Sequence, residues 1–415
     1  MMIMGRLLFL LLACTQFAMA QQSQLQTVQC YNAQKEQSLP VIALSSTEQL
    51  LFSFDDLQGG SKNYSYAVEH YTADWQPSGL STVDYVMSFA GDRLTDFQYS
   101  SGTLQKYTHY NLTLPNEQVK FKISGNYLLK VYENGNTNKP LLSQRFYVVD
   151  NKVYIKAEVK PTALVEERNS SQKVNFTIAH PQLSIQQPQQ DLKIRVMQNG
   201  NPHSAIVNNK PSFVQPGLLT YNDLQSYIFK GGNEFRKFDT RSLRSPGAQV
   251  KEILKDSLTT AVLLTDQSRH TQKYSSQFDE NGIYYIRNQD GRDNQTESDY
   301  VNVQFTLKAP LTQPAEVYVY GRFNDFRLDQ HSKLHYNAAK KSYQTNLLLK
   351  QGVYDYQYVS KDAATGMLSS TSLEGSFYET GNTYQVFVYF RKPGSRYDQL
   401  IGYFNTQTDT LLPSQ

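Results

Sequence analysis

Apolar and polar residues alternate with a period of two along much of the chain, which predicts β-strands rather than helices. In 317–320 two valines alternate with two tyrosines, and in 343–350 every second residue is Tyr, Thr or Leu. Gln351-Gly352 predicts a tight turn into 353–359, where tyrosines again occupy alternate positions. Because such strands each have one apolar face, we expect this hairpin to pack against a second sheet in a small β-sandwich.

Similar alternation predicts strands in the other parts of the chain. The clearest are 50–54, 64–71, 107–114, 125–132, 173–178, 192–198, 212–214, 261–264, 283–286, 384–390 and 400–404. Only 250–258 has helix-like apolar spacing, and the same segment also fits two short strands. With 30 tyrosines and 21 phenylalanines, the composition also favours β-structure. The sequence therefore predicts an all-β fold.

The N-terminus predicts a secretory signal peptide over residues 1–20. Arg6 precedes an apolar core, 7–13, and Ala18-Met19-Ala20 forms an A-x-A cleavage site. This apolar core is far shorter than the ~20 residues of a membrane-spanning helix. Leu11-Leu12-Ala13-Cys14 offers an alternative as a lipidation site, but Leu12 fits a lipoprotein box poorly. We therefore expect an exported protein without a transmembrane segment.

The remaining chain is long enough for several domains. We predict three tandem β-sandwich domains of the immunoglobulin or fibronectin type: an N-terminal domain at 27–150, a middle β-rich domain at 151–302 and a C-terminal domain at 303–405. Only Cys30 remains after cleavage of the signal peptide, so no disulfide can form within the chain. The formal charge of +3 argues against a nucleic-acid partner, which requires a strongly basic face.

No motif in the sequence predicts catalysis, a cofactor or a metal site. The nearest pair of histidines, His331 and His335, has no carboxylate or thiol at ligand spacing. Asp55-Asp56 is a carboxylate pair at a strand end, but neighbouring strand residues point to opposite faces. The hydrophilic segment 288–298 lacks the spacing of a calcium loop and predicts a solvated hairpin. We expect no enzymatic activity, no cofactor and no small-molecule ligand.

Two stretches predict contacts with a protein partner. Trp75, the only tryptophan, precedes a Pro-Ser-Gly loop and fits either a core aromatic or an exposed anchor. The segment 231–247 interleaves basic and aromatic residues, and fits either a binding surface or a loop whose arginines pair with Glu234 and Asp239. Large aromatics and arginines dominate interface energetics. We therefore select as candidate contacts Trp75, Phe235, Arg236, Phe238 and Arg241.

The C-terminal region resembles a known carbohydrate-binding module. The order of a strand, G-x-F-N-x-aromatic at 321–326, another strand and Q-G-x-Y-x-Y-x-Y at 351–358 resembles the immunoglobulin-like starch-binding (E-set) modules of glycogen-branching enzymes and AMP-activated kinases. Those modules hold glucose rings on flat aromatics, often Trp. Phe326 stands where such a module usually has Trp. The resemblance implies an immunoglobulin-like domain and, as an alternative function, glycan binding at Phe326.

Longer blocks resemble the plug protein of the Bacteroidetes type IX secretion system. They are spread over the chain at 39–57, 63–78, 107–116, 124–133, 231–244, 297–307 and 373–403. Two residues depart from the family pattern, since Tyr71 stands where Cys is expected and Phe326 where Trp is expected. The resemblance implies a non-enzymatic periplasmic protein. It would bind the periplasmic mouth of the outer-membrane translocon barrel and close it.

Overall fold

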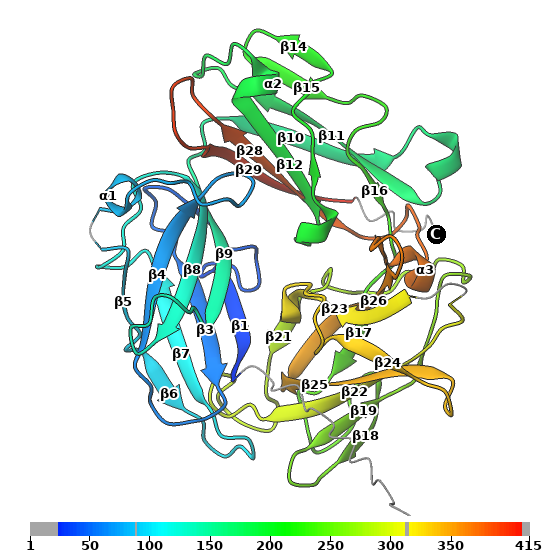
Figure 1. Cartoon of the computed structure of the whole chain (residues 1–415). Helices are drawn as coiled ribbons and strands as arrows, with labels where there is room; N and C mark the ends of the chain where they lie inside the picture. Colours follow the sequence, from blue (N-terminus) through cyan, green and yellow to red (C-terminus); the bar gives the residue numbers. More distant parts are fainter. Residues whose placement is uncertain (1–23, 88, 312–314, 409–415) are drawn as a thin grey trace, which may run out of the picture.

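The computed structural model describes residues 24–87, 89–311 and 315–408, so the predicted signal peptide and Cys14 lie outside the described residues. These residues form three β-rich bodies grouped around a common centre (Figure 1). The first body is blue to cyan in the figure. The second combines green and red strands, and the third combines green, yellow and orange strands. Almost all regular structure is β, which confirms the predicted fold class.

The first body is a β-sandwich whose two sheets enclose one core. Its four-stranded sheet contains β1 (Leu25–Asn32), β3 (Leu50–Asp56), β7 (Thr108–Leu114) and β6 (Phe97–Tyr99). Its five-stranded sheet contains β2 (Val41–Ala43), β9 (Leu142–Val149), β8 (Gly125–Glu133), β4 (Tyr64–Tyr71) and β5 (Gly91–Arg93), and the short helix α1 spans Thr82–Tyr85. Along β4, buried and partly exposed residues alternate, as the sequence predicted for 64–71.

The second body is a sandwich made from two separate parts of the chain. One sheet contains β10 (Tyr154–Pro161), β11 (Ser171–Ala179), β15 (Leu218–Tyr221), β14 (Phe213–Gln215) and β16 (Ile228–Lys230). The other contains β13 (Ile206–Val207), β12 (Leu192–Gln198), β28 (Thr383–Phe390) and β29 (Gln399–Gln407); the short helices are η1 (Val165–Glu167), α2 (Pro188–Asp191) and η2 (Pro202–Ser204). The C-terminal strands therefore complete the middle body, and the sheets do not divide the chain at 302.

The third body is one 11-stranded, barrel-like sheet around a single core, and not a two-sheet sandwich. Its main path contains β17 (Arg236–Asp239), β26 (Gly352–Asp362), β23 (Ala315–Tyr320), β24 (Lys333–Asn337), β25 (Ser342–Lys350), β22 (Tyr300–Lys308), β19 (Thr260–Leu263) and β18 (Val250–Leu254). Three short strands extend it: β20 (Asp266–Gln267), β21 (Tyr284–Ile286) and β27 (Leu368–Ser369). The helices η3 (Arg322–Asn324) and α3 (Thr371–Glu374) follow β23 and β27. Segment 250–258 therefore forms strand, as its second interpretation required.

The predicted hairpin at Gln351-Gly352 does not form. β25 pairs with β22 and β24, whereas β26 pairs with β17, β21, β23 and β27. The chain thus crosses from one side of the barrel-like sheet to the other. Gly352 is needed for a close approach, because a Cβ there would lie 2.3 Å from the carbonyl oxygen of Tyr285. Local alternation predicted both strands correctly, but it carried no information about their partners.

Candidate functional site

The basic and aromatic segment around β17 is folded into the third body. Phe238 is fully buried and stacks on Tyr354 with ring centroids 5.0 Å apart, and Phe235 is 5% exposed. The Arg236 guanidinium forms ion pairs of 2.8 Å with Asp266 and 2.9 Å with Glu374. These three predicted contact residues therefore serve the core in this structure, and their side chains are not open to a partner.

Glu374 is the charged centre of that cluster. It is fully buried and also accepts a hydrogen bond of 2.8 Å from Arg269. Burial alone would raise the pKa of the Glu374 carboxyl, but the guanidiniums of Arg236 and Arg269 hold it below its ordinary value. Arg236 and Arg241 of segment 231–247 therefore pair with carboxylates of the same chain, as the second interpretation of this segment predicted. Its partners differ, since Arg236 pairs with Glu374 and Asp266 in place of Glu234.

The two remaining contact candidates keep some exposure. Arg241 pairs with Asp239 at 2.5 Å, and 38% of its side chain is exposed. Trp75 is half-buried, lies 5.4 Å from the Tyr147 ring, and has the Arg145 guanidinium 4.5 Å above its own ring. Its backbone has a φ of 59°, which ends the turn after β4. Trp75 therefore packs against Tyr147 and keeps part of its surface exposed, and its role as a partner contact stays a prediction.

The glycan contact predicted at Phe326 is not available. Its side chain is 1% exposed and packs edge-on against Tyr320 at 5.4 Å, in a small core that also contains Phe235. A sugar ring stacks only on an exposed aromatic face. The G-x-F-N-x-F motif thus directs its last aromatic inward, and no observation favours the alternative function.

Buried charges join the first body to the third. Asp55, fully buried on β3, receives hydrogen bonds of 2.7 Å from Lys350 Nζ, 2.7 Å from the Tyr300 hydroxyl and 2.6 Å from His109 Nδ1. Burial would raise the pKa of Asp55, but Lys350 and His109 hold it below its ordinary value. We call Asp55, Lys350, Tyr300 and His109 the Asp55 network. Asp56 faces the other way, towards the Tyr64 hydroxyl at 2.8 Å, as expected for neighbours on a strand.

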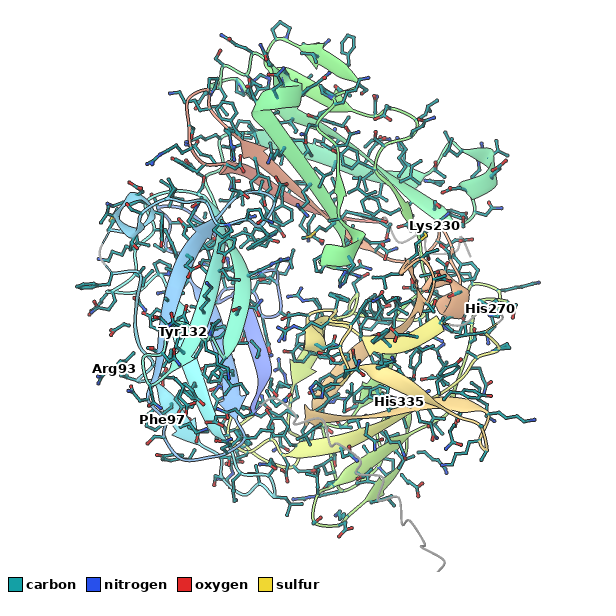
Figure 2. The ribbon with its side chains drawn as sticks, in the orientation of Figure 1. Arg93, Phe97, Tyr132, Lys230, His270 and His335 are labelled. Carbon is teal, nitrogen blue, oxygen red and sulfur yellow. The ribbon has the colours of Figure 1, made fainter. Side chains whose placement is uncertain are left out.

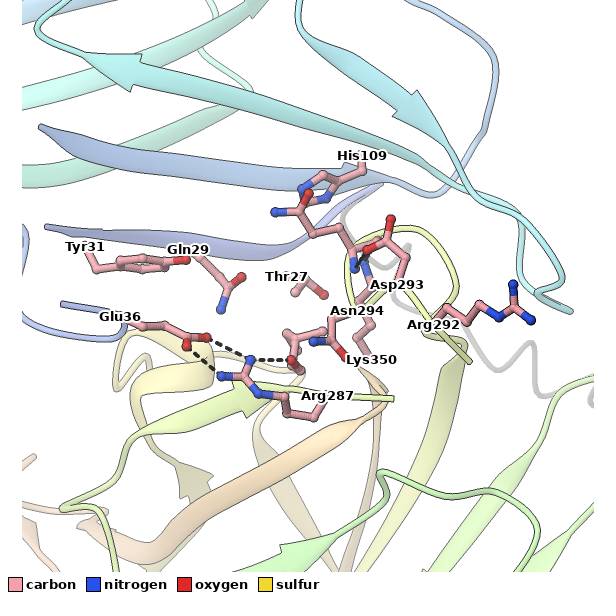
Figure 3. A pocket seen from close by; sticks show the side chains of 12 residues that line it. Thr27, Gln29, Tyr31, Glu36, His109, Arg287, Arg292, Asp293, Asn294 and Lys350 are labelled. Atoms are coloured by element: carbon pink, nitrogen blue, oxygen red, sulfur yellow. Dashed lines mark hydrogen bonds and ion pairs between the residues drawn. The ribbon is translucent and has the colours of Figure 1, made fainter. Parts of the chain in front are cut away.

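The segment 288–298 completes this contact and is not a solvated hairpin. The Tyr107 hydroxyl lies 2.9 Å from the carbonyl oxygen of Gln295 and 2.8 Å from that of Ser298. Beside it lies a pocket of about 390 Å³ (Figure 3), whose labelled walls include His109, Lys350 and a Glu36–Arg287 ion pair at 2.6 Å. Lys350 and Arg287 are paired with carboxylates of the chain, whereas Arg292, which also lines the pocket, is exposed.

A second pocket lies where all three bodies meet, and we call it the junction pocket. Its volume is about 480 Å³. The first body contributes Gln37, Trp75 and Arg145, the second Arg195 and Gly200, and the third Arg322, Asp325, Phe326 and Arg327. Two residues singled out from the sequence for separate reasons, Trp75 and Phe326, thus lie at the same pocket.

Among the described residues, no group of three His, Cys, Asp or Glu side chains is arranged to hold a metal ion. Figure 2 shows His270 and His335 at separate places on the third body. In the same residue ranges, no helix is both long enough and apolar enough to cross a membrane.

Comparison with known families relates this architecture to protein secretion. Residues 25–150, the first body, match the family described as Type 9 secretion system plug protein 1st domain. Over these residues, the chain is therefore similar to the first domain of the type 9 plug proteins. No curated protein matches the sequence.

A solved structure extends the similarity beyond the plug-family domain. A hypothetical protein from Parabacteroides merdae ATCC 43184 is 36% identical and has a TM-score of 0.90, over 93% of this chain and 97% of its own. The two proteins therefore belong to one family and share all three bodies. Collagen adhesin from S. aureus (8% identical, 93% of both chains, TM-score 0.12) and the E. coli alpha-2-macroglobulin (9%, 94% and 22%, TM-score 0.17) are too dissimilar to support an inference.

Sequence reasoning missed the Asp55 network and the junction pocket. Asp55 and Lys350 are 295 residues apart, and Asp55 and Tyr300 are 245 apart. The only local signal is Lys350, which follows three leucines at the end of its strand and equally fits a solvated strand end. Contacts of this kind form when the three bodies pack together, so they leave no pattern of residue spacing in the sequence.

Proposed function

We propose that this protein is a non-enzymatic periplasmic component of the type IX secretion system that binds the periplasmic mouth of the outer-membrane translocon and closes it. The single observation that carries the proposal is the family match of the first body over residues 25–150. A hypothetical protein from Parabacteroides merdae shares the architecture of the whole chain, so the domain that resembles the plug proteins stands in the same three-body setting in both proteins.

We place the contact with the translocon on the outer side of the first body, near α1 and β5 (Figure 1). Asp84 of α1 lies 3.6 Å from Arg396 of the second body, so this surface borders that body. Val83, Met87 and Phe89 are 67%, 64% and 68% exposed. Hydrogen bonds connect all three residues to one neighbouring segment, 118–122. Lys122 donates to the Val83 carbonyl, and the amides of Met87 and Phe89 donate to the carbonyls of Lys120 and Gln118. Exposed apolar side chains gathered in this way are typical of a protein-binding surface.

Trp75 and Arg241 remain further candidates, because both keep exposed area. Arg236, Phe235 and Phe238 would have to leave the core of the third body to take part.

Co-purification of the tagged protein with the translocon barrel tests the proposal, together with the permeability of the outer membrane in a deletion strain. We expect a complex, and entry of dyes and antibiotics into the deletion strain. The variant carrying Met87→Ser and Phe89→Ser should weaken the complex about tenfold. A matched control carries Tyr336→Ser and Met367→Ser, two exposed apolar residues of the third body, and should bind normally. A deletion strain that excludes dyes, with no complex on purification, would reject the proposal.

A further inference from the structure

The junction pocket carries positive charge that the protein does not neutralise. Four arginines line it, Arg145, Arg195, Arg322 and Arg327, against one acidic residue, Asp325, so the lining has a formal charge of +3. Asp325 is already paired with Arg327 at 3.0 Å. The other three guanidiniums must therefore find compensation elsewhere.

The charge of Asp325 also acts on Arg322, from beyond ion-pair distance, and Arg145, Arg195 and Arg322 have little other negative charge near them within the chain. In the described residues, neither Arg145 nor Arg322 has a carboxylate within 4.0 Å, and Arg195 reaches only Asp74, at 4.0 Å. Arg145 lies over the Trp75 ring, and Arg195 donates to the Ala73 carbonyl at 3.3 Å. Guanidiniums that bind only neutral groups keep free donors, and these suit the paired oxygens of a carboxylate or phosphate.

Arg322 is the arginine that touches all three bodies. It extends from η3 of the third body, donates to the Ser38 carbonyl of the first body at 3.2 Å, and approaches Gly200 of the second. A Cβ at Gly200, whose φ is 66°, would lie 3.5 Å from Arg322 Nη1 and 2.9 Å from Leu39. Burial lowers the pKa of the Arg322 guanidinium, so its charged form is under-solvated at this position.

A second, independent observation concerns Gln37. Its side chain is only 3% exposed and lines the junction pocket, yet its amide nitrogen Nε2 has no hydrogen-bond partner within the described part of the chain. A buried donor without a partner costs about 1–3 kcal/mol. An acceptor from outside the chain, held in the pocket, would satisfy it.

We propose that the junction pocket binds a small organic anion, bearing carboxylate or phosphate groups, through the guanidiniums of Arg195 and Arg322 and the amide of Gln37. Arg145 adds charge at the mouth. The volume of 480 Å³ lies within the range of ligand pockets and exceeds what a single inorganic ion fills. Tyr147, Met197 and Tyr284 supply apolar wall for the carbon skeleton. The composition of the sequence did not predict this ligand class.

Because the donors come from three bodies, the anion would also hold those bodies together. Binding of a ligand to the folded state alone raises stability with ligand concentration. The ligand would therefore raise the unfolding temperature of the whole chain, in addition to occupying its pocket.

Calorimetric titration and thermal unfolding of the full chain test this proposal, with citrate as the carboxylate probe and pyrophosphate as the phosphate probe. Sodium chloride at equal ionic strength serves as the reference. We expect at least one probe to bind with one-site stoichiometry and to raise the unfolding temperature beyond the chloride reference. The probe that binds more tightly identifies the class of the anion.

Variants then locate the site. Arg322→Gln, Arg195→Gln and Gln37→Leu should each weaken the bound probe about tenfold. Arg145→Gln, at an exposed position, should weaken it less and leaves the body contacts in place. Arg396→Gln removes the same charge from an exposed side chain outside the pocket and should bind as the unmodified chain does. The proposal fails if both probes match the chloride reference, or if all four pocket variants bind as tightly as Arg396→Gln.

Discussion

The first body meets the third at two places that treat charge in opposite ways. In the Asp55 network, one buried carboxylate receives donors from a lysine, a tyrosine and a histidine, all within 2.7 Å. In the junction pocket, three of the four arginines lack a close carboxylate, and a buried glutamine amide has no partner in the described chain. The Asp55 carboxylate has its partners within the protein, whereas the junction pocket has more hydrogen-bond donors than the protein satisfies.

This difference distinguishes a structural contact from a ligand-binding site. A buried charge with all its partners fixes how two bodies sit, since removing any one partner leaves the others uncompensated. Donors left open around a cavity are costly to the fold and are compensated only by a ligand. The same pair of bodies can therefore hold a rigid arrangement at one end and present a binding site at the other.

The largest effect is expected from removing the lysine of the Asp55 network. Lys350→Met leaves the Asp55 carboxylate buried without its closest positive charge and should lower the free energy of unfolding by about 3–5 kcal/mol. Urea unfolding, followed by the fluorescence of Trp75, the only tryptophan, measures the change. Lys340→Met, at an exposed position, is the matched control and should be nearly neutral. Equal urea midpoints for the two variants would show that the network does not hold the bodies together.

Acid should weaken the Asp55 network. The pKa of Asp55 is held below 3.8 in the folded protein, so its stabilising contribution is complete above that pH. It is lost as the pH falls through the folded value. Between pH 5 and 2.5, the unmodified chain should lose stability more steeply than Asp55→Asn, by up to about 1.4 kcal/mol per pH unit. Parallel curves of unfolding temperature against pH would contradict this expectation.

The smallest effect is expected at the exposed ion pair of the junction pocket. Arg327 and Asp325 have side chains 52% and 40% exposed, and surface pairs of this kind contribute about 0–1 kcal/mol. Arg327→Gln should therefore change the free energy of unfolding by less than about 0.5 kcal/mol in the absence of an added anion. A loss comparable to that of Lys350→Met would mean that both contacts are structural, and the contrast between them would disappear.

Local features of the chain were predictable because they depend on near neighbours. Alternation at 64–71 and 192–198 matched β4 and β12 along their full lengths. The exposure of Phe235 and Phe238 was not predictable. A strand that mixes basic and aromatic residues looks the same at a surface as in a core that supplies Asp266 and Glu374 as partners.

By itself, the sequence determined that this chain is built of strands and that its first body is similar to the first domain of the plug proteins, because a two-residue period and a family pattern are written in consecutive residues. Only the tertiary structure decided that β28 and β29 complete the second body, that Lys350 meets Asp55, and that four arginines surround one pocket. Strand partners and buried charge pairs are chosen by the packing of whole faces, which joins residues hundreds of positions apart.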